Sequence, residues 1–201
     1  HEAIELLRHE LGDHHPYLVS ARLNLGRALA YAKKPAESEV ELRAALERAR
    51  EVWGDDHPHT ARVWGTLGLT LTSLHRTAEA EDALRRSLAA RERSLGPDHQ
   101  EVASALFNLG TMLRGAGRHA EAIEPLRRGM AIRRRLDDAE SDLIPWLFAI
   151  GDSEVADGRM ADARRTLQEA LAKAESDGAP RLDFARVRDA LARATAPEDP
   201  A

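Results

Sequence analysis

Histidine is the residue type in this sequence with the widest chemical range. The chain holds nine histidines and no cysteine, which excludes disulfides, thiolate metal sites and thiol nucleophiles. His15, His57 and His99 are each 42 residues apart, so they occupy equivalent positions of a repeating unit and lie too far apart to share one ion. We expect each ring to cap the helix that follows it. The stretch from His9 to His14 lacks the spacing of a zinc-binding His-Glu-x-x-His helix, and we predict no metal site.

Motifs for catalysis are absent from the sequence. Gly151-Asp152-Ser153 resembles a nucleophile block only as a tripeptide, and neither Gly-x-Ser-x-Gly nor a phosphate-binding glycine loop occurs. The many carboxylates show no pairing with an apolar pocket that would shift a pKa. We therefore predict no catalytic residues, no cofactor and no enzymatic activity.

Composition narrows the partners that the chain could bind. The net charge of −5 argues against nucleic acid, and no apolar run is long enough to cross a membrane. The basic residues are nearly all arginine, which fits either coding bias or selection for bidentate binding of carboxylates and phosphates. The lack of cysteine and of a signal-peptide pattern predicts a cytoplasmic location, and a helical pattern that starts at His1 suggests a fragment of a longer chain.

Glycine positions show that the chain is repetitive. Gly26, Gly68 and Gly110 are 42 residues apart and each follows a leucine, and Gly151 follows Ile150 after a further 41 residues. The same interval of 42 relates Gly12, Gly54 and Gly96. A fixed period of this length is typical of repeat architectures.

Each repeat has the apolar spacing of two helices. In the second repeat one stripe runs from Val63 to Leu74 and another from Ala80 to Leu95, with the short polar turn 75–77 between them. The glycine after the leucine falls inside the first helix, where it costs about 1 kcal/mol relative to alanine. We expect the two helices of a pair to approach closely there, so that a side chain would clash.

These positions resemble the tetratricopeptide repeat, whose pattern has a bulky residue, Leu-Gly, an apolar residue and later two small residues around a large one. The second repeat shows it as Trp64, Leu67-Gly68, Leu71, Ala80, Leu84 and Ser87. The usual period is 34 residues, and the 42-residue variety is similar to the repeats of kinesin light chain and of many bacterial signalling proteins. The resemblance covers about residues 1–175.

The resemblance implies an all-α fold, a right-handed superhelical α-solenoid of stacked antiparallel helix pairs. The predicted organisation is a partial repeat with only its second helix (1–12), four repeats (13–54, 55–96, 97–138 and 139–178), a capping helix (179–194) and a tail (195–201).

The resemblance also places a concave groove along the first helix of each pair. In the family, groove side chains lie five or one before the leucine of Leu-Gly, and two or five after it. The fourth repeat has Pro145, Ala149, Asp152 and Val155 at these positions, and we expect no polar clamp there. The residues expected to bind a peptide are Ser20, Asn24, Arg27, Arg62, Thr66, Leu69, Ser104, Asn108, Thr111 and Arg114.

The expected function is that of a noncatalytic scaffold that binds a partner protein or peptide of acidic character. Asparagine amides would hold the peptide main chain, and arginines would bind its carboxylates. Two alternatives stay open at this point. The array could associate with a second copy of itself, or it could be the regulatory arm of a kinase, NTPase or protease encoded elsewhere in a longer chain.

Overall fold

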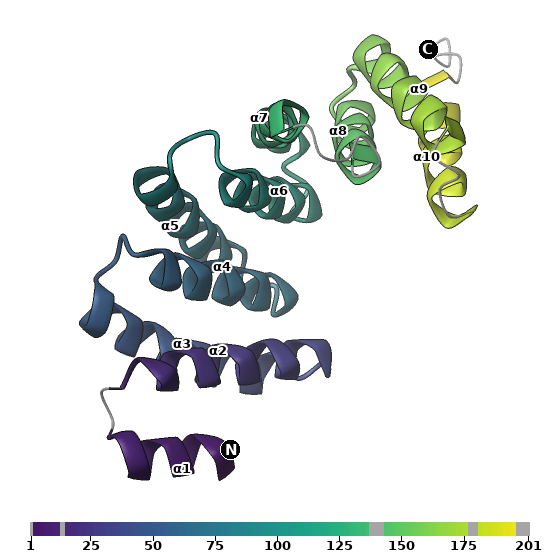
Figure 1. Ribbon diagram of the computed structural model, residues 1–201. Coiled ribbons are helices and arrows are strands. Elements are labelled where there is room, and N and C mark those ends of the chain that lie inside the picture. The colour runs from purple at the N-terminus through teal and green to yellow at the C-terminus, as the bar shows by residue number, and fades with distance from the viewer. Residues whose placement is uncertain (1, 13–14, 137–142, 177–180, 196–201) are drawn as a thin grey trace. The chain divides into compact units, whose positions relative to one another are not determined.

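The computed structural model describes residues 2–12, 15–136, 143–176 and 181–195 (Figure 1). These residues form helices and turns, with no strand among them. The all-α prediction is therefore confirmed for this part of the chain. The helices are α1 (Glu2–Leu11), α2 (Pro16–Tyr31), α3 (Pro35–Trp53), α4 (Pro58–Ser73), α5 (Thr77–Leu95), α6 (Gln100–Gly115), α7 (His119–Leu136), α8 (Ile144–Ala156), α9 (Met160–Ser176) and α10 (Arg181–Thr195).

The chain divides into two compact units, an N-terminal unit of residues 1–108 and a C-terminal unit of residues 109–201. In the N-terminal unit α2 packs on α3 and α4 on α5, with α3 against α4 and α1 against α2. In the C-terminal unit α8 packs on α9 and α7 against α8, and α10 contacts both α8 and α9. Successive helices thus pair as a tetratricopeptide solenoid requires. The exact repeat boundaries stay a prediction, and the tail from residue 196 lies outside the described residues.

Histidine caps fix where three of the first helices begin. The Nδ1 atoms of His15, His57 and His99 each accept a hydrogen bond from the backbone N–H two residues further on, at 3.1–3.2 Å. This satisfies one of the backbone donors that the first turn of a helix leaves free. A proline then occupies the first position of α2 and of α4, where its missing N–H costs nothing. The predicted capping role of the three rings is confirmed.

A glycine–leucine contact sets how closely the two helices of each pair approach. A Cβ atom built on the glycine would lie 2.5–2.7 Å from the Cγ of the leucine 16 residues later. The leucines are at most 1% exposed, so they have little room to yield. The expected reason for a glycine inside the helix is confirmed. The pairs are Gly26–Leu42, Gly68–Leu84, Gly110–Leu126 and Gly151–Leu167.

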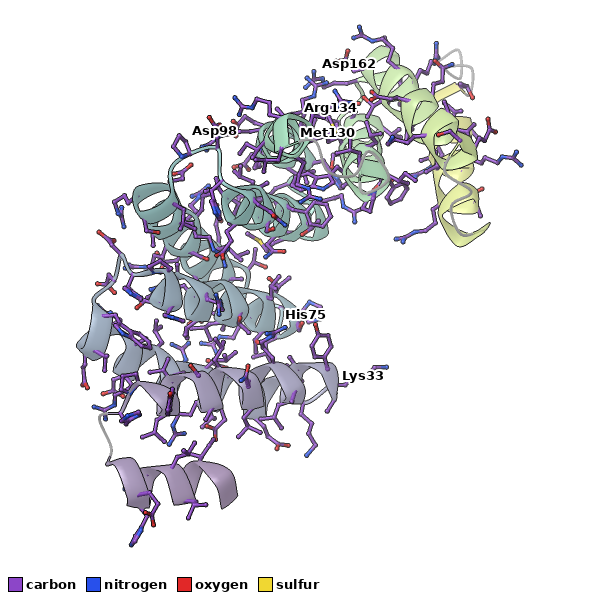
Figure 2. The ribbon with its side chains drawn as sticks, in the orientation of Figure 1. Lys33, His75, Asp98, Met130, Arg134 and Asp162 are labelled. Atoms are coloured by element: carbon purple, nitrogen blue, oxygen red, sulfur yellow. The ribbon has the colours of Figure 1, made fainter. Side chains whose placement is uncertain are left out.

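The turn between the helices of each pair is also repeated. The second-last residue before the second helix has a positive φ: 59° at Lys33, 58° at His75, 76° at Gly117 and 77° at Gly158. Lys33 and His75 lie at the ends of α2 and α4 (Figure 2). L-residues with a side chain adopt this conformation at a cost, whereas glycine does not.

A basic residue follows each positive-φ residue, and it binds the carboxylate three positions later, near the N-terminus of the second helix. The N–O distances are 2.5–3.0 Å. These contacts repeat with the period of the fold. The pairs are Lys34–Glu37, Arg76–Glu79, Arg118–Glu121 and Arg159–Asp162.

The C-terminal unit has a carboxylate in its core. Glu154 of α8 is fully buried and accepts a hydrogen bond from Arg127 of α7 at 2.5 Å. The corresponding residues of the second and third repeats are Leu71 and Leu113, which are 2% exposed. The Oε2 atom of Glu154 has no hydrogen-bond partner. Arg127 itself is 46% exposed, so the ion pair is only half-buried. It contributes little net stability, because removing the carboxylate from water is costly.

Candidate binding surfaces

Charge is segregated between the first and second helices of the N-terminal unit. Neither α2 nor α4 contains an aspartate or a glutamate, although the whole chain carries a net charge of −5. The partner helix α3 alone has five glutamates. Arg22 of α2 is bound to Glu41 of α3 at 2.6 Å. The remaining arginines of the two first helices, Arg27 and Arg62, give this face a positive charge.

Arg27 and Arg62 are exposed and make no ion pair with any residue that the structure describes. Among the arginines whose side chains the structure describes, only these two and Arg188 have no hydrogen bond, ion pair or ring contact. Burial is the main cause that lowers the pKa of Arg91, and the positive charge of Arg62 lowers it further. Unpaired guanidinium groups keep all five N–H donors available for a carboxylate.

A pocket of about 430 Å³ lies between α2 and α4. It combines the guanidinium group of Arg27 with apolar groups, of which Tyr31 is 82% and Leu69 43% exposed. Large exposed apolar side chains beside an unpaired cation are suited to a partner segment that has both an apolar and an acidic group. The lining residues are Arg27, Ala30, Tyr31, Thr66, Leu69, Thr70 and Ser73.

Three of the residues predicted to bind, Arg27, Thr66 and Leu69, meet in this pocket. The hydroxyl of Thr66 donates its hydrogen to the carbonyl of Arg62 at 3.0 Å. Its oxygen can therefore only accept a further hydrogen bond. Tyr31 was missed by the sequence reasoning. The available signal was a large aromatic ring at the last position of a first helix, where the next two repeats have small residues.

The other predicted residues of the N-terminal unit lie along its first helices without forming a described pocket. Ser20 and Asn24 are exposed on α2. Ser104 of α6 donates its hydroxyl to the carbonyl of Gln100 at 3.2 Å, and Asn108 is half-buried.

In the C-terminal unit, Arg114, which was predicted to bind a peptide, forms an ion pair within the chain. It donates to Asp152 of α8 at 2.8 Å, and Arg193 of α10 donates to the other oxygen of Asp152 at 2.7 Å. Burial raises the pKa of Asp152, but the hydrogen bonds from Arg193 and Arg114 outweigh it and hold the pKa below its ordinary value. Asp152 of the fourth repeat is thus bound to two arginines of its own unit. The expectation that this repeat offers a peptide no polar clamp stays a prediction.

A phenylalanine orders two of the arginines in this unit. The guanidinium carbon of Arg114 lies 5.8 Å and that of Arg186 5.0 Å from the ring centroid of Phe148, within the range of cation–π attraction. The sequence reasoning did not single out Phe148, Arg186 or Arg193. Their role depends on the contact between α8 and α10, which periodicity alone does not define.

A stack of aromatic rings surrounds the start of α4. The ring centroids of Trp53, His57 and His59 lie 4.9–5.4 Å from one another, with interplanar angles of 14–28°. Burial, Arg62 and His57 lower the pKa of His59. No group of three or more potential metal ligands occurs within the described residues.

The tetratricopeptide repeat profile matches residues 31–93 and 63–135, which together cover more than half of the chain. The chain belongs to the tetratricopeptide repeat family. The family match agrees with the positions of the Leu-Gly pairs and with the consecutive helix pairs of the structure. No curated protein matches the chain at a significant level. Among the described residues of this tetratricopeptide protein, no helix is both long enough and apolar enough to cross a membrane.

Solved structures with the same fold include kinesin light chain-like proteins. BtubC (BKLC) from P. vanneervenii is 20% identical with a TM-score of 0.77, over 82% of this chain and 66% of its own. A putative kinesin light chain of Podosopora anserina with nearly identical TPR-like repeats is 18% identical with a TM-score of 0.77, over 90% of this chain and 86% of its own. At these identities the likeness shows a shared fold and supports the 42-residue, kinesin light chain-like type of repeat.

A third similar structure is aspartyl phosphate phosphatase F from Bacillus subtilis. It is 16% identical with a TM-score of 0.72, and the match covers 90% of this chain but only 46% of the phosphatase. The tetratricopeptide chain therefore spans less than half of that protein, and the similarity again concerns the fold.

Proposed function

We propose that this tetratricopeptide array is a noncatalytic scaffold that binds an acidic segment of a partner protein along α2 and α4. The observation that carries the proposal is the charge segregation of the N-terminal unit. Its two first helices have no acidic residue, and Arg27 and Arg62 are exposed and unpaired on them. A tetratricopeptide fold suits protein–protein interaction, and YrrB, a TPR protein of similar fold, is described as having an unusual peptide-binding site.

The pocket between α2 and α4 provides the other half of the recognition. An acidic side chain of the partner pairs with Arg27, while a neighbouring apolar side chain packs on Tyr31 and Leu69. Charged contacts at an exposed surface mainly set specificity and association rate. Burial of the apolar groups supplies free energy that salt does not screen.

The direct test is fluorescence anisotropy with a fluorescein-labelled, glutamate-rich peptide. Arg27→Gln combined with Arg62→Gln should weaken binding about tenfold or more, because each lost charge-assisted hydrogen bond contributes about 1.5 kcal/mol or more. Binding should also weaken as salt is raised, because the charges are exposed. The matched control is Arg85→Gln with Arg165→Gln, which removes two exposed arginines from the second helices α5 and α9.

Equal loss in the control pair would mean that only net charge matters, and unchanged binding in Arg27→Gln with Arg62→Gln would refute the proposed surface. A second variant tests the asparagines of the predicted groove. Asn24→Ala with Asn108→Ala should weaken capture of the peptide main chain while helicity and melting temperature stay unchanged. Light scattering with and without peptide reports any self-association separately.

A further inference from the structure

The C-terminal unit contains a second pair of arginines, one on α6 and one on α10, and both already bind a carboxylate of the same unit. Arg114 of α6 and Arg193 of α10 each donate one N–H to a different oxygen of Asp152, at 2.8 and 2.7 Å. The exposed fractions of the side chains are 27% for Arg114, 17% for Asp152 and 56% for Arg193. The site is therefore open to solvent on the side of Arg193.

Arg114 is held in place by contacts other than its ion pair with Asp152. Phe148 supports Arg114 from its ring face and also contacts Arg186. The Nε atom of Arg114 is buried and has no hydrogen-bond partner, so the side chain is held by packing as well as by its ion pair. A preorganised guanidinium group loses little conformational freedom when it binds a carboxylate.

The charged residues near the pair include more arginines than carboxylates. Arg186, Asp189 and Arg193 share one face of α10 by helical spacing. Together with Arg114 and Asp152 they make three arginines and two aspartates, so one positive charge is in excess. Asp152 accepts one hydrogen bond from Arg114 and another from Arg193.

We propose that Arg114 and Arg193 form a second site for carboxylate groups, in the C-terminal unit, and that Asp152 occupies this site as an internal ligand. The inference rests on the proposed function, because it assigns the same acidic partner class. In the free chain Asp152 takes the place of a partner's carboxylate, so acidic segments bind the unpaired Arg27 and Arg62 of the N-terminal unit in preference. Asp152 is thus the residue that decides which arginines are open to the partner.

A contrast within the same unit provides a matched control. Asp162 of α9 also accepts hydrogen bonds from two arginines, Arg159 at 2.7 Å and Arg165. It lies on a second helix, and Figure 2 labels it on α9. Asp152→Asn and Asp162→Asn make the same change of charge and free two arginines each, but only the first opens a first-helix site.

The experiment measures anisotropy of the fluorescein-labelled, glutamate-rich peptide with Asp152→Asn in a background of Arg27→Gln and Arg62→Gln. This background removes the proposed site at Arg27 and Arg62. A failure of the proposal for Arg114 and Arg193 can therefore be distinguished from a failure of the proposed function. We expect Asp152→Asn to raise the affinity about tenfold, as expected for one released charge-assisted contact. We expect Asp162→Asn to leave the affinity unchanged and Arg114→Gln, added to Asp152→Asn, to abolish the gain.

A lack of gain with Asp152→Asn would overturn the proposal, provided that circular dichroism shows α10 still folded. Should Asp152→Asn unfold α10, peptide affinity is measured instead for Asp152→Ser and for Arg114→Gln alone, and these two variants decide whether the proposal holds. An equal gain with Asp162→Asn would also overturn it, because the effect would then come from net charge. A glutamine-rich peptide of the same length must show no gain in any variant.

Discussion

Substituting Gly68 by alanine is the sharpest test of how the helix pairs are held together. The added Cβ would lie 2.7 Å from Cγ and 2.9 Å from Cδ2 of Leu84, and 3.3 Å from the carbonyl oxygen of Ala80. Ordinary carbon–carbon contacts are about 3.5–4.0 Å, so the contact with Leu84 must lengthen by roughly 1 Å. Leu84 is 1% exposed, and it cannot move into solvent.

Two opposing effects set the size of the change. Overpacking a filled core costs about 1–3 kcal/mol, and replacing glycine by alanine inside a helix recovers up to about 1 kcal/mol. We expect Gly68→Ala to lower the free energy of unfolding by about 1–2 kcal/mol. For a chain of this length that corresponds to a fall in melting temperature of about 2–8 °C.

Urea and thermal unfolding followed by far-UV circular dichroism give both quantities. Gly115→Ala is the matched control, because no atom lies within 4 Å of the added Cβ, and it should be neutral or stabilising. Gly68→Ala should cost less in a Leu84→Ala background than in the wild type, since the space for the new methyl group is then free. A Gly68→Ala variant as stable as the wild type would refute the close-contact argument.

Three further predictions concern single side chains. Lys33→Gly and His75→Gly should each raise the free energy of unfolding by about 1 kcal/mol in urea titrations, because both residues have a positive φ; Lys34→Gly, where φ is −116°, should not. Glu154→Leu should be neutral or stabilising, whereas Arg127→Ala should destabilise by about 3 kcal/mol, because it leaves the buried carboxylate unpaired; the reverse order in chemical denaturation would contradict the assigned roles. Because the pKa of Asp152 is lower in the folded chain, its stabilising contribution is present above the ordinary aspartate range and is lost as pH falls through the lowered value. Unfolding midpoints of Asp152→Asn should therefore depend less on pH than those of the wild type in that acidic window.

The fold could be predicted from sequence because its determinants recur. The interval between Gly26, Gly68 and Gly110 marks the packing of one helix on the next, and the same period locates the histidine caps. The positive φ in the turn could be predicted from sequence in only two of the four repeats. Gly117 and Gly158 are typical of such a conformation, whereas the lysine and the histidine at the same position are not.

The candidate site was less predictable because it depends on contacts between repeats. The family pattern placed Arg27 on a first helix, but only the structure shows that it lacks an ion pair and lies beside Tyr31. The same pattern gave Arg114 an equal role, and Asp152 changes that role through a contact that spans 38 residues. Whether an arginine is free depends on whether it forms an ion pair. Ion pairs between residues far apart in the sequence cannot be predicted from the local sequence pattern.

The glycine–leucine contact has a consequence for how such a chain tolerates changes of length. Its interval is 16 residues in all four pairs, even though the fourth pair follows the third after 41 residues instead of 42. The difference in length therefore lies outside the segment from the glycine to the leucine. Within a pair the turn is fixed by backbone bonds, as from Arg76 N–H to the Leu71 carbonyl at 3.0 Å. Each hairpin is a unit of exchange that recombination can duplicate, delete or transplant whole, and the connectors between hairpins are where foreign loops can be inserted.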